Sequence, residues 1–296
     1  MIQMSSNSRY LIFNLAIHLG EVYKTQFFSY TIGIWHINKL VFYDEILLNE
    51  KSNVIRTRYL KLIENKIVLQ DFKSMFNYPI SAENENLKRQ PIREVCPIEF
   101  IINSNSTSAK YSILFTTFLM NHTNLNWGNS IAYSEAELEH IRPVRWKSYN
   151  PEIECTKENL LSYFEDLIKL EEFKDFFSTN VLATLKDKFA ALSYFDLTQE
   201  PAPKESIIEF IGNKVILAKA DNKKLQNFNF KEKVDHFRKK TNQRQLIVLP
   251  SIGDECLGIL NYESHFLIKE ILERSLNFTK MLFINFDKSL DEISEI

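Results

Sequence analysis

Apolar residues recur every three or four positions along much of the chain, which is the pattern of helices that bury one face. The pattern predicts helices within residues 8–75, over 109–120, over 156–197, over 230–244 and from about 262 to 284. In the third stretch the apolar residues on one stripe are Leu160, Leu161, Phe164, Leu167 and Ile168. The chain is therefore expected to be predominantly helical.

Two short stretches depart from this pattern and are expected to be extended. The first covers residues 130–141, where Pro143 prevents the segment from continuing as a helix. The second covers residues 213–219, a short β-type run that follows Gly212. The sequence thus predicts an α+β fold that is mostly helical and contains a small extended element.

A polar stretch divides the chain into two regions. Residues 77–91 are rich in turn-forming residues and are the best candidate for a boundary or linker. The helical region 1–95 has apolar stripes but no cluster of His, Asp or Glu at ligand spacing, which predicts a docking or regulatory role. Residues 105–296 would form the second domain, with a helical insertion at about 156–200.

The composition excludes several classes of protein. The chain of 296 residues has 36 Lys and Arg against 38 Asp and Glu, so its net charge of −2 leaves nucleic-acid binding to a local patch. Its glycines form neither a Rossmann nor a P-loop motif. Cys96, Cys155 and Cys256 lie far apart without a CxxC pair, which excludes a thiolate zinc site and suits a reducing cytoplasm. The apolar stretches are too short or too interrupted for a membrane span.

Two segments carry residues suited to phosphodiester hydrolysis. His140 stands at the end of an expected strand, and its neighbour Glu139 supplies a hard oxygen ligand of the kind that Mg²⁺ or Mn²⁺ binds. Asn222 adds an amide oxygen near the start of an expected helix. A base beside a divalent cation can activate water and stabilise the charge that builds on phosphate, so these residues favour a hydrolase.

The same two segments resemble a known nuclease domain. Glu-His-Ile-x-Pro at 139–143 and the run from Gly212 to Lys233 are similar to the HNH-type C-terminal domain of GmrSD-like modification-dependent restriction enzymes. The matching residues of the second segment are Gly212, Asn213, Leu217, Asn222, Leu225, Asn227, Phe230 and Lys233. The resemblance covers residues from about 110 to 285.

The resemblance implies a ββα-metal (His-Me finger) endonuclease that cleaves DNA in a prokaryotic defence system. It implies His140 as general base, Glu139 and Asn222 as ligands of Mg²⁺ or Mn²⁺, and Asn213 or Asn227 as support for the base or the turn. The N-terminal domain of such enzymes has no counterpart in residues 1–95. The chain is therefore either one subunit of a split system with a partner protein, or rebuilt there for another partner.

A basic stretch lies beside the candidate centre. Residues 204–244 contain eleven Lys and Arg against five Asp and Glu, a local balance of +6. The expected DNA contacts are Lys223, Lys224, Lys233, Arg238, Lys239 and Lys240. A solvated helix face is the simpler alternative for these lysines. For the whole chain the alternative is a catalytically inactive HNH-like subunit that binds DNA or assembles a complex.

Overall fold

The computed structural model describes part of the chain, and the fold is given for that part. The described residues are 39–47, 51–64, 109–110, 112–113, 116, 136–142, 157–174, 176, 179–180, 183–184, 186–187, 209–225, 228–242 and 268–287. The expected linker at 77–91 and the candidate Asn227 lie outside them. No helix within these ranges is both long and apolar enough to cross a membrane.

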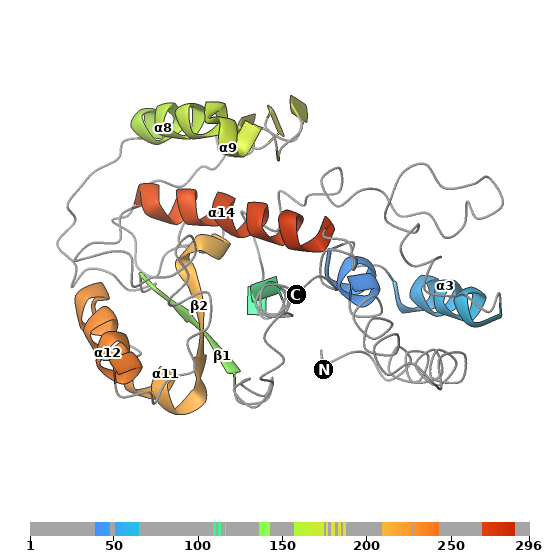
Figure 1. The fold of residues 1–296 in the computed structure, drawn as a ribbon, viewed down its shortest axis with the longest axis horizontal. Coiled ribbons are helices and arrows are strands. Elements are labelled where there is room, and N and C mark those ends of the chain that lie inside the picture. The colour runs from blue at the N-terminus through green and yellow to red at the C-terminus, as the bar shows by residue number, and fades with distance from the viewer. Residues whose placement is uncertain are drawn as a thin grey trace, which may run out of the picture. The chain divides into compact units, whose positions relative to one another are not determined.

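The chain forms two compact units, residues 1–96 with 286–296 and residues 97–285. The first contains η1 (Phe42–Leu47) and α3 (Ser52–Glu64). The second contains β1 (Ala136–His140), α8 (Lys157–Lys169), α9 (Glu171–Lys174), η5 (Ile211–Asn213), β2 (Lys214–Ala218), α11 (Lys219–Leu225), α12 (Phe230–Asn242) and most of α14 (Ile268–Asp287). Helices thus dominate the described residues, which confirms the coarse α+β class (Figure 1).

The single sheet of the described residues is an antiparallel pair of two short strands. β1 and β2 pair from Ala136 opposite Ala218 to His140 opposite Lys214. They come from the two stretches that the sequence predicts as extended. α11 begins at the residue after β2, so the local order along the sheet is strand, strand, helix.

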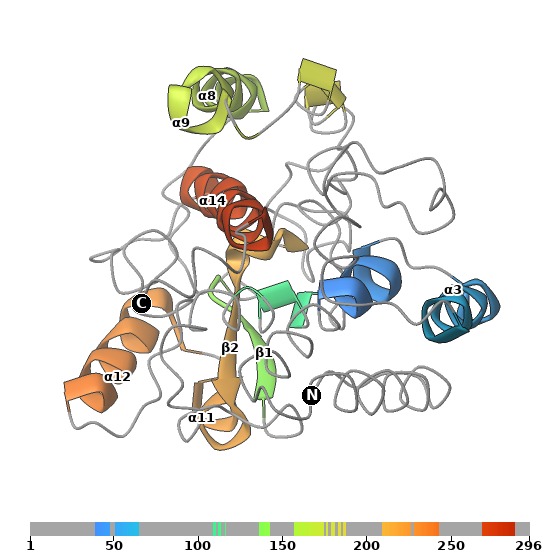
Figure 2. The ribbon, with the colours of Figure 1, turned by 45° about the vertical axis from the view of Figure 1, so that its right-hand side comes forward.

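Helix α14 organises the second unit because it contacts elements on two sides. Tyr163 of α8 donates a hydrogen bond to Glu273 at 3.2 Å, and Lys280 reaches Glu172 of α9 at 3.1 Å. On the other side, Arg274 and Ser275 bond to the segment that leads into β2. Two views show α14 lying between the α8–α9 pair and the sheet (Figures 1 and 2).

The core of the first unit is apolar and aromatic. Val41, Phe42 and Tyr43 are buried, and the ring of Tyr43 lies 6.3 Å from that of Phe286 at the end of α14. The ammonium of Lys39 lies over the same Phe286 ring at 4.6 Å. On α3, Ile55 is buried. This packing accounts for the apolar residues of the described segments 39–47 and 51–64.

The glycine at 212 is required by close packing against α14. A Cβ atom added there would stand 2.0 Å from the carbonyl oxygen of Ile271 and 2.7 Å from the backbone nitrogen of Ser275. The Gly212 N–H donates to Ser275 Oγ at 2.9 Å, and that hydroxyl donates to the Ile271 carbonyl at 2.7 Å. Backbone atoms of a helix cannot move aside as a flexible side chain can, so only glycine fits.

We expect Gly212→Ala to lower the free energy of unfolding by about 1–3 kcal/mol, the usual cost of an overpacked core. Urea unfolding followed by circular dichroism measures this change. Lys223→Ala, on the exposed face of α11, is the control and should stay within about 0.5 kcal/mol of wild type. A Gly212→Ala protein as stable as the control would show that α14 does not press on this turn.

Candidate functional site

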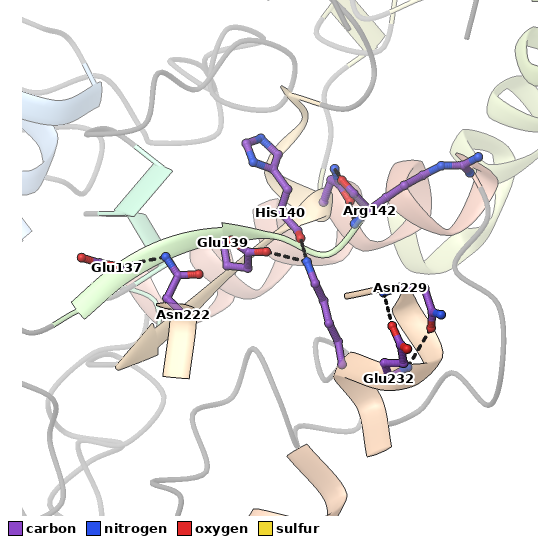
Figure 3. A network of polar contacts seen from close by, with 9 residues as sticks. Glu137, Glu139, His140, Arg142, Asn222, Asn229 and Glu232 are labelled. Carbon is purple, nitrogen blue, oxygen red and sulfur yellow. Dashed lines mark hydrogen bonds and ion pairs between the residues drawn. The ribbon is translucent and has the colours of Figure 1, made fainter. Parts of the chain in front are cut away.

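The candidate site surrounds the end of β1, where successive side chains point to opposite faces. Glu137 and Glu139 lie on one face of the sheet, and Leu138 and His140 lie on the other. The imidazole of His140 therefore points away from the Glu139 carboxylate (Figure 3). The site has two sides, each with its own set of polar partners.

Asn213 fixes the end of the sheet by binding the chain just after His140. Its Oδ1 accepts the backbone N–H of Arg142 at 2.8 Å, and its Nδ2 donates to the Arg142 carbonyl at 3.0 Å. The Ile141 N–H also donates to the Asn213 carbonyl at 2.7 Å. Asn213 is fully buried. Of the two roles expected for this residue, the contacts are with the turn and not with the imidazole.

Asn222 comes to the glutamate side of the sheet on α11. Its Nδ2 donates to Glu137 Oε2 at 2.9 Å, and its side chain is 9% exposed (Figure 3). Its Oδ1 is buried and has no hydrogen-bond partner within the described part of the chain. A buried acceptor without a partner is costly unless something satisfies it. The amide is thus oriented with its oxygen available.

Lys233 enters the same side from α12. The helix begins with a reciprocal cap, in which the Asn229 N–H donates to Glu232 and the Glu232 N–H donates to Asn229 Oδ1. One turn into the helix, the Lys233 ammonium donates to Glu139 Oε1 at 2.5 Å and to the His140 carbonyl at 2.7 Å. Burial lowers the pKa of Lys233, and the Glu139 carboxylate opposes that shift.

The histidine side contains a second buried ion pair. Glu209 Oε2 lies 3.3 Å from His140 Nε2 and 3.1 Å from Lys214 Nζ. Burial raises the pKa of Glu209, but His140 and then Lys214 outweigh it and lower the pKa to about 2. Burial lowers the pKa of Lys214, which is 1% exposed, and Glu209 opposes that shift. Glu209 is therefore an ionised carboxylate between two nitrogen groups.

Five of the six expected DNA-contacting residues fall into two groups, and the side chain of Lys240 lies outside what the structure describes. Lys223, Lys224, Arg238 and Lys239 are exposed on α11 and α12. Lys233 is buried, and its ammonium faces Glu139, although the sequence predicts a phosphate contact for it. The exposed residues stay candidates for phosphate contact, whereas Lys233 has a structural partner.

Three residues of the site were not anticipated from the sequence. Glu137 could have been found, because it is two positions before Glu139 on a strand and must share its face. Glu209 and Lys214 have no such signal. Their pairing depends on how the segment before β2 folds back beside His140.

The glutamate side carries oxygen atoms of the chemical type that divalent cations bind. The described residues contain no group of three or more His, Cys, Asp or Glu close enough to hold a metal ion. The available set instead consists of the unpartnered Asn222 Oδ1 with the Glu137 and Glu139 carboxylates, and such oxygens suit Mg²⁺ or Mn²⁺. Lys233 occupies one oxygen of Glu139, and a carboxylate has a second oxygen with which to bind a cation.

Comparison of the chain with protein-family models, curated proteins and solved structures finds no match.

The pKa of Glu209 gives a prediction for Glu209→Gln. A folded-state pKa of about 2, below the unfolded value near 4.5, means that ionised Glu209 stabilises the fold above pH 4.5. This contribution is lost as the pH falls toward about 2. The difference in the free energy of unfolding between wild type and Glu209→Gln should be fully developed at about pH 5. Below about pH 4.5 it should shrink by about 1.4 kcal/mol per pH unit.

Urea unfolding at a series of pH values between about 7 and 3 measures this difference. Glu171→Gln, at an exposed position of α9, is the control and should stay within about 0.5 kcal/mol of wild type. A Glu209→Gln difference that is unchanged at pH 3 would mean that Glu209 is not held between His140 and Lys214.

Proposed function

We propose that this chain is a divalent-metal-dependent DNA endonuclease of the ββα-metal type, acting in a restriction-like defence system. The observation that carries the proposal is the order of the site. β1 ends at His140, Asn213 holds the chain that follows it, and α11 brings Asn222 beside the strand directly after β2. This strand–strand–helix order, with those three residue types at those places, is what the motif resemblance leads one to expect.

In the proposed reaction His140 is the general base. It takes a proton from the attacking water, whose oxygen then bonds to phosphorus. Glu139 and Asn222, with Glu137 beside them, would hold Mg²⁺ or Mn²⁺. That cation supplies stabilisation of the negative charge on the phosphate and the leaving oxygen. Since base and ligands leave β1 on opposite faces, the phosphodiester would lie across the end of the strand at His140.

The basic residues of α11 and α12 supply a surface for the DNA backbone. Buried Phe230, Val234 and Phe237 hold α12 to the core, so Arg238 and Lys239 remain exposed on its outer side. Exposed Lys223 and Lys224 lie on α11, the helix that carries Asn222. Positive charge next to the candidate centre favours binding of phosphates.

One observation favours the alternative, an inactive subunit that binds DNA or assembles a complex. The Lys233 ammonium already neutralises Glu139, and His140 faces away from the glutamate side. A chain that kept the fold after losing catalysis could replace a bound cation with such a lysine. Gel-shift of DNA without nicking would support this alternative.

The enzyme proposal predicts different defects for two substitutions. His140→Ala should slow plasmid nicking by about 10²–10⁴-fold, because proton abstraction is lost while DNA binding is kept. Free imidazole should restore part of that rate. Asn222→Ala should be rescued by more Mn²⁺ and not by imidazole, because it removes an oxygen ligand. Nicking in Mg²⁺ or Mn²⁺, with and without EDTA, measures these rates.

His236→Ala is the matched control, since this histidine is on α12 and contacts Asp221 at 3.6 Å. It should nick at close to the wild-type rate and should not respond to imidazole. Nicking by His140→Ala at the wild-type rate, or wild-type nicking that survives EDTA, would count against the proposed centre.

The basic residues of α12 should act on affinity and not on chemistry. In the variant with Arg238, Lys239 and Lys240 replaced by Ala, up to three phosphates of the bound DNA are no longer neutralised. The slope of log K against log salt should then become shallower by about 0.9 for each such phosphate of a duplex. Fluorescence anisotropy with a labelled duplex at several salt concentrations measures the slope.

The matched control replaces three exposed lysines of another region, Lys169, Lys174 and Lys186, by Ala. This variant should keep the wild-type slope. Equal slopes in both triple variants would assign the α12 residues to a solvated helix face.

A further inference from the structure

We propose that Glu209 is a positioning residue for His140, which fixes the imidazole so that Nδ1 is the nitrogen that takes the proton. The inference rests on the proposed function of His140 as general base. It adds a residue, Glu209, that neither the motif nor the strand pattern indicates.

The contact is made by the nitrogen farther from the backbone. Glu209 Oε2 lies 3.3 Å from His140 Nε2, and both side chains are partly buried, 23% and 25% exposed. The other ring nitrogen, Nδ1, has no hydrogen-bond partner among the residues that the structure describes. The ring is therefore held at one nitrogen and open at the other.

This contact selects the tautomer of the neutral ring. A neutral imidazole carries one N–H, and an ionised carboxylate can only accept a hydrogen bond. The Lys214 ammonium at 3.1 Å keeps Glu209 ionised, so the hydrogen of neutral His140 is on Nε2. The lone pair that can accept a proton is then on Nδ1.

The position of Glu209 is itself fixed by its surroundings. Lys214 is the β2 residue opposite His140, and its buried ammonium holds the same Glu209 oxygen at 3.1 Å. Glu209 also lies three residues before Gly212, whose carbonyl and N–H bond to Arg274 and Ser275 of α14. The carboxylate is therefore carried by a segment that is hydrogen-bonded to α14.

In the proposed reaction, the orientation of the His140 ring determines which of its nitrogens takes the proton. Nδ1 of His140 takes one proton from water as the water oxygen bonds to phosphorus. The bond from phosphorus to the leaving oxygen breaks, and the leaving oxygen takes a proton from solvent. The imidazolium that forms has a positive charge, which the Glu209 carboxylate beside Nε2 stabilises, as a carboxylate does for the histidine of a catalytic triad.

The test must avoid leaving a buried charge unpaired, because that alone can unfold a protein. Glu209→Leu combined with Lys214→Met removes the carboxylate and its ammonium partner together and keeps the side-chain volume similar. Lys214→Met alone is the matched control, since it keeps the Glu209 contact with His140 and leaves a carboxylate that is 23% exposed and so still reached by solvent. Urea unfolding of each variant establishes that it is folded.

The first readout is the tautomer of His140, which needs no enzymatic activity. Proteins labelled with ¹⁵N-histidine give separate Nδ1 and Nε2 resonances, and His140 is assigned from the spectrum of His140→Ala. Neutral His140 should be the Nε2–H form in wild type and in Lys214→Met. The Glu209→Leu/Lys214→Met variant should lose this preference.

The second readout is the rate of nicking. Partners that orient a metal-binding histidine typically contribute about 10–100-fold, and kcat of the double variant should fall by a similar factor relative to Lys214→Met. The Kd for DNA should not change. Added to His140→Ala, the same two substitutions should cause no further decrease in rate, because they act through the missing ring.

The outcomes separate this inference from the proposed function. Absence of metal-dependent nicking in wild type overturns the proposed function, and the tautomer measurement still decides whether Glu209 orients the ring. With nicking present, an unchanged tautomer or an unchanged kcat in the double variant overturns the role of Glu209. A further decrease in rate in the His140→Ala background also overturns it.

Discussion

The site depends on the pairing of two strands that are far apart in sequence. β1 ends at residue 140 and β2 begins at residue 214, so no tight turn sets their register. A slip of one residue would exchange the faces of every side chain on a strand. Asn213 prevents such a slip, because its amide binds both the N–H and the carbonyl of Arg142 and so admits one alignment. Each polar contact around β1 presupposes that alignment.

The end of β1 has two distinct sets of polar partners, one on each face, and each set is held in place by one helix. On one side, α14 holds the turn through Arg274 and Ser275, and the turn holds Glu209 and Lys214 next to His140. On the other side, the capped start of α12 delivers Lys233 to Glu139. Successive side chains of a strand point to opposite faces, so the adjacent residues Glu139 and His140 belong to different networks. Burial makes each network sensitive to an unpaired charge.

The sequence predicted much of the backbone and part of the site. The extended stretches, the basic helix and the C-terminal helix follow from local periodicity, and the place of Asn222 follows from the helix after β2. The contact partner of each side chain could not be predicted from the sequence. Within a run of charged residues, the sequence does not distinguish Lys233 from the exposed lysines. Only the packing of α12 shows that Lys233 is buried. Glu209 lies in a segment without a motif, and its contact with His140 spans 69 positions.

The charge balance of the two sides distinguishes what each can do. On the glutamate side, Glu139 is paired with Lys233, and the charge of Glu137 opposes the lowering of the Lys110 pKa by burial, so two carboxylates face two ammonium groups. The Asn222 amide oxygen has no partner there among the described residues. On the histidine side, Glu209 is already matched by Lys214. A proton taken by His140 would be the new charge there, and it would arise next to a carboxylate that is fixed in place. At the end of β1, an amide oxygen without a partner among the described residues thus lies on one face, and a paired carboxylate lies beside an imidazole on the other.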